Sequence, residues 1–423
     1  MRVLLISANT EKLYMPPLPL GLNCVAKEIR KDRHQVRLVD LMGSGDNQSV
    51  IRHAIEEMQP QVIGISVRNV DNQNMAEPRF LLEPVREAVE LCRTLSDATI
   101  VVGGAAFSLF PGAILSYLGA DIGICGEGEV AFANLLLALE DGWDPAKIGG
   151  VWLPGQKAGS VAYREDLDIL PLPDPSLWNV PAGLAGETCV PLQTRRGCAM
   201  RCSYCSTSAL EGTRIRKYDI DKVVEALGEH VAAGFTDFYF VDNTFNLPRD
   251  YAKYLCEDII KAGWKIRWRC ILYPGFIDEK LVKKMADAGC FEVSLGFESG
   301  SPLILKKLNK KYTTDQVQLS SELLRKHGIR RMGFLLLGGP GETRETVQES
   351  LDFADSLRLD MLKVTTGIRI YPGTALEKIA RKEGVIARGD DLLHPRFYLA
   401  KGLEPWLAPL LREWMSQRPY CIT

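Results

Sequence analysis

Short apolar runs alternate with amphipathic stretches along the first 150 residues of the chain. Five of these runs have the length and β-branched content of buried strands, at residues 3–6, 36–39, 62–66, 100–102 and 122–125. Between them, apolar residues recur at helical spacing at residues 20–31, 49–58, 81–95 and 111–118. This alternation predicts a doubly wound, flavodoxin-like (Rossmann-type) domain: a parallel sheet with helices on both faces, which binds ligands at the carboxyl ends of its strands.

The alternation resumes from about residue 189. Six runs with strand character lie at residues 190–194, 237–241, 266–272, 292–296, 333–337 and 363–370. Helical periodicity falls between them at residues 220–233, 251–262 and 278–288. The pattern predicts a partial (β/α)6 TIM-like barrel, whose ligand-binding loops follow the carboxyl ends of the strands.

The two patterns define the predicted domains. A chain of 423 residues exceeds what one hydrophobic core usually serves, and the prolines within residues 171–175 interrupt any helix between the two patterns. We expect a doubly wound domain at 1–150, a linker at 151–188, a barrel at 189–375 and an extension at 376–423. The extension has an amphipathic stretch at 405–415, which is predicted to pack against the barrel. A lid over the substrate is the alternative.

The composition is that of an ordinary globular protein, with 46% hydrophobic and 25% charged residues and a net charge of −2. Lys and Arg are spread along the chain, so nothing indicates a nucleic-acid partner. The amino-terminal apolar run is too short for a signal peptide, and no apolar run reaches membrane-spanning length. The eleven cysteines therefore indicate a reducing, cytoplasmic location and metal ligands rather than disulfides.

Three of those cysteines, Cys198, Cys202 and Cys205, lie within eight residues, directly after the first predicted barrel strand. Thiolates select zinc, copper(I) or an iron–sulfur cluster. A structural zinc site closes with four protein ligands, and no second Cys/His pair follows at zinc-finger distance. Three ligands fit a four-iron cluster that keeps one iron open for a substrate or cofactor. Three unrelated core cysteines are the alternative, and the scattered positions of the other eight argue against it.

The spacing Cys-x-x-x-Cys-x-x-Cys, with Tyr204 before the last cysteine, resembles the signature of the radical S-adenosylmethionine (SAM) enzymes. In that family the open iron of a [4Fe–4S] cluster binds SAM, and an electron from the cluster cleaves SAM to a 5′-deoxyadenosyl radical. The resemblance implies that residues after the barrel strands contact SAM. The implied SAM-binding residues are Tyr204, Asp242, Asn243, Glu298, Ser299, Gly338, Gly339, Pro340, Ile370 and Tyr371.

The first domain resembles the cobalamin (B12) binding domain that precedes the radical domain in one branch of this family. The matching features are a proline-rich first loop, the Gly103-Gly104 pair and the glycines that flank Glu127, which permit close approach of a large ligand. The motif Asp-x-His-x-x-Gly is absent, so we expect no protein histidine on cobalt. The implied cobalamin-binding residues are Pro17, Leu18, Gly21, Ser66, Val67, Arg68, Asn69, Gly103, Gly104, Ala105, Gly126, Glu127 and Gly128. A ligand-free scaffold domain is the alternative.

Together the resemblances imply a cobalamin-dependent radical SAM methyltransferase, which moves a methyl group from methylcobalamin to an unactivated carbon of a small-molecule or peptide substrate. The implied cofactors are a [4Fe–4S] cluster, SAM and cobalamin, with a flavodoxin or ferredoxin as electron donor. A cyclase or rearrangement enzyme without methyl transfer is the main alternative. A redox or cobalamin sensor is a third hypothesis, which turnover of SAM would exclude. The sequence assigns no catalytic side chain.

Overall fold

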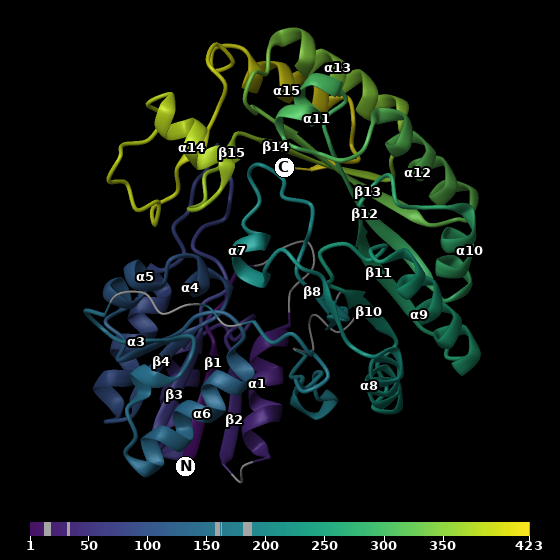
Figure 1. Ribbon diagram of the computed structural model, residues 1–423. Coiled ribbons are helices and arrows are strands. Elements are labelled where there is room, and N and C mark those ends of the chain that lie inside the picture. The colour runs from purple at the N-terminus through teal and green to yellow at the C-terminus, as the bar shows by residue number, and fades with distance from the viewer. Residues whose placement is uncertain (12–17, 32–33, 157–160, 162, 181–187, 423) are drawn as a thin grey trace.

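The protein is a mixed α/β molecule built on two sheets that lie in separate parts of the chain (Figure 1). The computed structural model describes residues 1–11, 18–31, 34–156, 161, 163–180 and 188–422. The amino-terminal half forms one layered body, and the remainder forms a curved sheet with helices on its outer face. The open face of the curved sheet is turned toward the first body.

The first sheet has six strands in the order β2-β1-β3-β4-β5-β6. Their bounds are Arg2–Ser7 (β1), Gln35–Asp40 (β2), Val62–Ser66 (β3), Thr99–Gly103 (β4), Ile122–Ile124 (β5) and Val151–Trp152 (β6). The first five are parallel and β6 is antiparallel to β5. The order of the parallel strands is that of flavodoxin-like folds, so the predicted doubly wound architecture is confirmed. The sheet continues through β6 into the stretch predicted as linker.

Helices cover both faces of this sheet. Their bounds are Leu20–Arg30 (α1), Asn47–Met58 (α2), Glu83–Leu95 (α3), Ala105–Leu109 (α4), Pro111–Leu118 (α5) and Gly128–Asp141 (α6), with short 3-10 turns at Pro145–Lys147 and Pro175–Leu177. The four predicted helices are confirmed, whereas α4 and α6 were not predicted. Helix α6 buries residues on most of its circumference, so its sequence lacks the polar stripe by which an amphipathic helix is recognised.

The second sheet is parallel, in the order β17-β14-β13-β12-β11-β10-β7. Its strands are Val190–Leu192 (β7), Asp237–Phe240 (β10), Arg267–Leu272 (β11), Cys290–Glu298 (β12), Arg330–Leu337 (β13), Met361–Thr366 (β14) and Cys421–Ile422 (β17). The helices between and after them are Thr207–Glu211 (α7), Ile220–Ala232 (α8), Arg249–Ala262 (α9), Glu279–Asp287 (α10), Pro302–Lys307 (α11), Thr314–Lys326 (α12), Arg344–Ser356 (α13), Ala375–Lys382 (α14) and Leu407–Ser416 (α15). The six predicted barrel strands are confirmed in order.

The carboxyl-terminal part differs from the prediction in two respects. The predicted strand 363–370 is wrong beyond Thr366, because Gly367 has a φ of +73° and turns the chain. The next residues, Ile368–Arg369 (β15), pair with Phe397–Tyr398 (β16) in a separate hairpin. The predicted extension also adds β17 to the edge of the barrel sheet, beside β14. A second small hairpin joins Arg195–Arg196 (β8) to Arg216–Lys217 (β9).

Buried ion pairs join the two parts of the protein. Arg369 donates to Asp71 at 2.7 Å, with both side chains almost fully buried. At the start of α6, Glu129 accepts from Arg196 at 2.6 Å and Glu127 accepts from Arg216 at 2.6 Å. A buried charge that loses its partner is costly, so these pairs fix how the first sheet faces the barrel. None of the helices in the described ranges is both long and apolar enough to cross a membrane.

Candidate functional site

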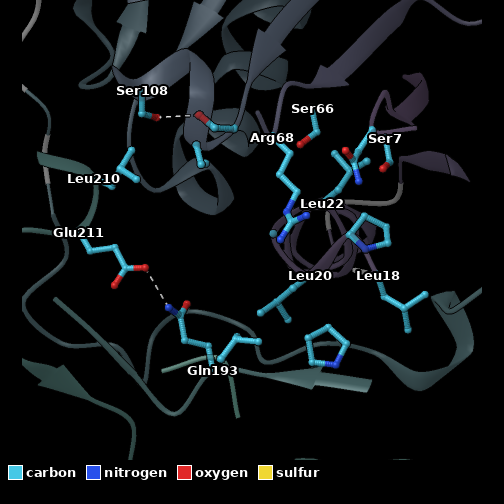
Figure 2. Close-up of a pocket in the computed structure, with 18 of the residues that line it drawn as sticks. Ser7, Leu18, Leu20, Leu22, Ser66, Arg68, Ser108, Gln193, Leu210 and Glu211 are labelled. Atoms are coloured by element: carbon cyan, nitrogen blue, oxygen red, sulfur yellow. Dashed lines mark hydrogen bonds between the residues drawn. The ribbon is translucent and has the colours of Figure 1, made fainter. Parts of the chain in front are cut away.

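A cavity of about 1000 Å³ lies between the two sheets, and both parts of the chain line it. The first domain contributes the carboxyl ends of β1, β3 and β4 and the start of α1 (Figure 2). The barrel contributes side chains from the inner face of β7, β10, β11, β12, β13, β14 and β17. A cavity of this size at the switch point of a doubly wound sheet is the expected place for a large ligand.

Most residues predicted to bind cobalamin line this cavity. Those that do are Leu18, Gly21, Ser66, Arg68, Gly103, Gly104, Ala105, Gly126, Glu127 and Gly128. Two predictions are not supported: Val67 points into the hydrophobic core at 1% exposure, and Asn69 borders a separate, much smaller hollow. Pro17 lies outside the described residues. Val67 and Asn69 do not line the cavity, whereas Ser66 and Arg68 do, because neighbouring side chains along an extended chain point to opposite faces.

The prediction missed several residues of the first-domain wall. They are Leu5, Ser7, Asn9, Pro19, Leu20, Leu22, Val25, Gly64, Ile65, Val101, Val102, Ser108, Ile124, Glu129 and Phe132. Many lie within strands or helices rather than in the loops that glycine and proline mark. Alternation along β1 and β3 was the available signal, since Leu5 and Ser7 are two residues apart.

The first-domain wall fits a corrin in its shape and composition. A Cβ added to Gly21 would meet no atom within 4 Å, so the start of α1 leaves open space. Gly104, with a φ of +100°, lets the chain pass so close to Val67 that a Cβ would lie 2.6 Å from its carbonyl oxygen. The described residues that line the cavity include no histidine.

The Arg68 side chain enters the cavity from the loop after β3 (Figure 2). Its burial lowers the pKa of the guanidinium. Within the described part of the chain, Arg68 makes no ion pair or hydrogen bond. The site therefore presents an unpaired cation to whatever occupies the cavity.

The three cysteines of the loop lie between β8 and α7, beside the cavity rather than in its wall. All three are half-buried free thiols. Burial raises the pKa of the Cys198 and Cys202 thiols, and the nearby charge of Cys205 raises both further. In the described ranges, no three metal-ligating side chains converge closely enough to hold a single ion. The loop supplies three thiols, the ligand type of iron–sulfur clusters.

Hydrogen bonds connect the cysteine loop to the cavity wall. Arg196, which donates to Glu129, also donates through Nε to the Gln193 side chain at 3.2 Å. Gln193 donates at 3.0 Å to Glu211, as Figure 2 shows, and Glu211 accepts from the Gly197 amide at 2.9 Å. The residue before Cys198 is thus held by a chain of contacts that begins at α6 in the first domain.

We predict that Gly197→Ala lowers iron bound per chain to less than half of the wild-type value. Gly197 has a φ of +93°, and a Cβ there would lie 2.0 Å from the Arg214 carbonyl oxygen. The backbone next to Cys198 must therefore move, in addition to the roughly 1–2 kcal/mol that a left-handed conformation costs a non-glycine residue. Iron analysis after anaerobic reconstitution measures the effect. Gly389→Ala, at an exposed glycine with open space around it, is the matched control; equal iron in both variants would contradict the prediction.

Glu298, at the end of β12, is the predicted SAM-binding residue that reaches the cavity wall. It has a φ of +60°, and its carboxylate accepts from Lys310 Nζ at 3.2 Å. The same ammonium group donates to the Tyr204 hydroxyl at 3.0 Å. These buried groups place a carboxylate, an ammonium and a phenol beside Cys202, whose charge also affects Lys310 and Tyr204.

The structure gives several other predicted SAM contacts a structural role. Asp242 is fully buried, and its carboxylate accepts from the Thr194 amide, the Thr194 hydroxyl and the Arg195 amide. Ser299 is fully buried and shares a hydrogen bond with Ser350 on α13. The Asp242 and Ser299 side chains are therefore engaged within the protein, and a role of either in binding SAM stays a prediction.

Several backbone groups near the end of the barrel that were predicted to contact SAM make hydrogen bonds within the protein. The Ile370 amide donates to the Arg396 carbonyl, so it is not free for adenine, and the Ile370 carbonyl accepts from Arg369. The amides of Gly338 and Gly339 donate to Glu342, and Pro340 beside them is buried. Asn243 donates to Glu211. Tyr371 packs over the Arg369 guanidinium at 5.0 Å.

Glu342 gives this region a predicted pH dependence. Burial raises the pKa of its carboxyl to about 7, although the two glycine amides oppose this shift. The folded state then binds the proton more tightly than the unfolded chain, so this contribution to stability is complete below about pH 4.5 and is lost as the pH rises to about 7. We expect Glu342→Gln to raise the unfolding temperature relative to wild type at pH 7.5, by a few degrees, and to have little effect at pH 5. Thermal unfolding at both pH values tests this, and an equal shift at both would contradict it.

Comparisons with known proteins match both parts of the chain. The B12 binding domain model matches residues 6–136, and the Radical SAM superfamily model matches residues 192–354. An uncharacterized methyltransferase of Pyrococcus horikoshii is 28% identical over 90% of this chain and 83% of its own length. The tryptophan 2-C-methyltransferase of Streptomyces laurentii is 23% identical over 88% of this chain and 73% of its own length.

This chain also resembles solved structures of such proteins. The radical SAM methyltransferase TsrM of Kitasatospora setae, solved with cobalamin and a [4Fe–4S] cluster, superposes with a TM-score of 0.87. The superposition covers 100% of this chain and 93% of the other, at 23% sequence identity. At this identity the likeness establishes the fold, including the arrangement of a B12-binding sheet against a radical SAM barrel.

Proposed function

Because this chain joins a B12-binding domain to a radical SAM domain and thus belongs to the cobalamin-dependent radical SAM enzymes, we propose that it is a C-methyltransferase. The two relatives described above are both methyltransferases by name. When bound, the cluster supplies an electron to SAM and cobalamin supplies the methyl group.

One observation carries the proposal: a single cavity is walled by the carboxyl ends of the first sheet and by the inner face of the barrel. A corrin held by the first sheet would face a substrate held in the barrel, and both would lie in this one cavity. The ion pairs of Arg196, Arg216 and Arg369 keep the two walls in this relation. Positioning and exclusion of water are the contributions that the protein makes to such chemistry.

The proposed ligand sets follow from the site. Cys198, Cys202 and Cys205 would hold the cluster. Glu298, with Lys310 and Tyr204 behind it, would meet SAM at the edge of the cavity. The corrin would lie along the glycine-rich first-domain wall, with Arg68 directed at it. A flavodoxin or ferredoxin donor, and the cytoplasmic location that the cysteine content favours, remain part of the proposal.

The test is an anaerobic incubation of the reconstituted protein with SAM, a reductant and hydroxocobalamin, followed by chromatography. A methyltransferase forms S-adenosylhomocysteine as well as 5′-deoxyadenosine. Formation of 5′-deoxyadenosine alone would indicate a cyclase or rearrangement enzyme and would contradict the proposal. Intact SAM after addition of extracts of candidate substrates would indicate a sensor.

A further inference from the structure

The charges that line the cavity include both paired and unpaired groups. The residues with ionised side chains are Arg68, Glu127, Glu129, Arg196, Glu211, Glu298 and Lys363. All four carboxylates accept hydrogen bonds from protein groups, and Arg196 pairs with Glu129. Arg68 and Lys363, in contrast, have no ion pair or hydrogen bond within the described ranges of the chain. Opposite charges attract more strongly in a cavity that is partly shielded from water than in bulk solvent, so a ligand that supplies a negative charge would be bound preferentially beside these two cations.

The two cations stand on different walls. Arg68 belongs to the first domain, where the corrin is proposed, whereas Lys363 lies on β14 of the barrel. Lys363 precedes Thr366, the end of its strand, by three residues, which corresponds to about 10 Å along the strand. In the sheet register, Glu298 on β12 is level with Val364, so Lys363 is separated from this expected SAM contact mainly by the two-strand spacing, roughly 10 Å across the sheet. Its charge faces the part of the cavity that remains for the substrate.

The surroundings of Lys363 are apolar. Its partners in the sheet register, Phe334 on β13 and Ile422 on β17, both line the cavity. Met332 and Ile271 continue this surface across the sheet, and Ser294 lies among them. The barrel wall thus combines one point charge with an area of hydrocarbon and an aromatic ring.

We propose that Lys363 binds an anionic group of the substrate, a carboxylate or a phosphate, and that the body of the substrate is apolar and packs on Phe334, Met332 and Ile422. This inference rests on the proposed function, since it assigns the substrate class of the same cavity. A Lys ammonium acts as a point charge and does not select between the two anions by shape. Lys363 is a specificity-determining residue in this proposal.

Binding of small probes to the reconstituted holoprotein tests the proposal without turnover. The probes are 3-phenylpropionate, phenethyl phosphate and the neutral 3-phenylpropionamide, measured by equilibrium dialysis at one ionic strength. We expect at least one anion to bind tenfold or more tightly than the amide. Lys363→Met should remove this preference, and Lys363→Arg should retain most of it.

Other results would overturn the inference. Equal binding of the anions and the amide, no saturable binding of either anion, or an unchanged preference in Lys363→Met would each do so. A loss of cobalamin from Lys363→Met would instead assign the lysine to the corrin, and would also overturn it. Formation of S-adenosylhomocysteine by the wild type is measured separately and tests the proposed function. If the anions are preferred but this product does not form, the anion-binding role of Lys363 is supported and the methyltransferase proposal is contradicted.

Discussion

Replacement of Cys198, Cys202 and Cys205 together by alanine abolishes iron binding and SAM cleavage in the reconstituted protein. The three thiols share one loop and influence one another electrostatically, and thiolates are the ligands of iron–sulfur clusters. Without the cluster, no electron reaches SAM, so 5′-deoxyadenosine should fall to the level of a protein-free control. Iron analysis, the visible absorbance of the cluster and chromatography of the SAM products measure the result.

The matched control for this variant is Cys421→Ala. Cys421 is another half-buried free thiol, on β17 and remote in sequence from the loop. It should retain the iron content and SAM cleavage of the wild type. Iron at wild-type stoichiometry in the triple variant would show that the cluster ligands lie elsewhere, and would remove the basis of the proposed function.

The substitution Gly21→Phe weakens cobalamin binding tenfold or more, equivalent to about 1.4 kcal/mol of binding free energy. Gly21 lies in the first turn of α1 and lines the cavity, and nothing stands within 4 Å of an added Cβ. The Cβ therefore meets no protein atom, and we expect the phenylalanine ring to occupy part of the proposed corrin site. Helix propensity also favours the change over glycine, so the fold and the iron content should be preserved. Equilibrium dialysis with hydroxocobalamin gives the dissociation constant.

This position is a sharper test than Gly104, which also lines the cavity. A side chain at Gly104 would collide with the Val67 backbone, so lost binding there could reflect a distorted loop. The control is Gly389→Phe, the same change at an exposed glycine outside the cavity. Wild-type affinity in a folded Gly21→Phe protein would show that the corrin does not lie along the start of α1.

The site illustrates what sequence patterns can and cannot specify. Glycines at strand ends were a sound guide to the first-domain wall, because close approach of a ligand excludes side chains there. Asp242 and Ser299 follow strands in the same manner, yet the fold uses both for internal hydrogen bonds. Position after a strand places a residue near the site, but the direction of its side chain depends on neighbours that are distant in the chain.

The sequence by itself determined the α/β class of both parts, the succession of their strands along the chain and the loop that carries three cysteines. Hydrophobic periodicity and cysteine spacing are local properties, so they can be recognised in the sequence without a structure. The tertiary structure alone decided that β17 adds an edge strand to the barrel sheet beside β14, that Arg196 and Arg369 join the domains through buried carboxylates, and that Lys363 faces the cavity without a partner in the described part of the chain. The physical reason is that pairing, burial and charge balance depend on which distant residues meet, and a linear pattern does not contain that information.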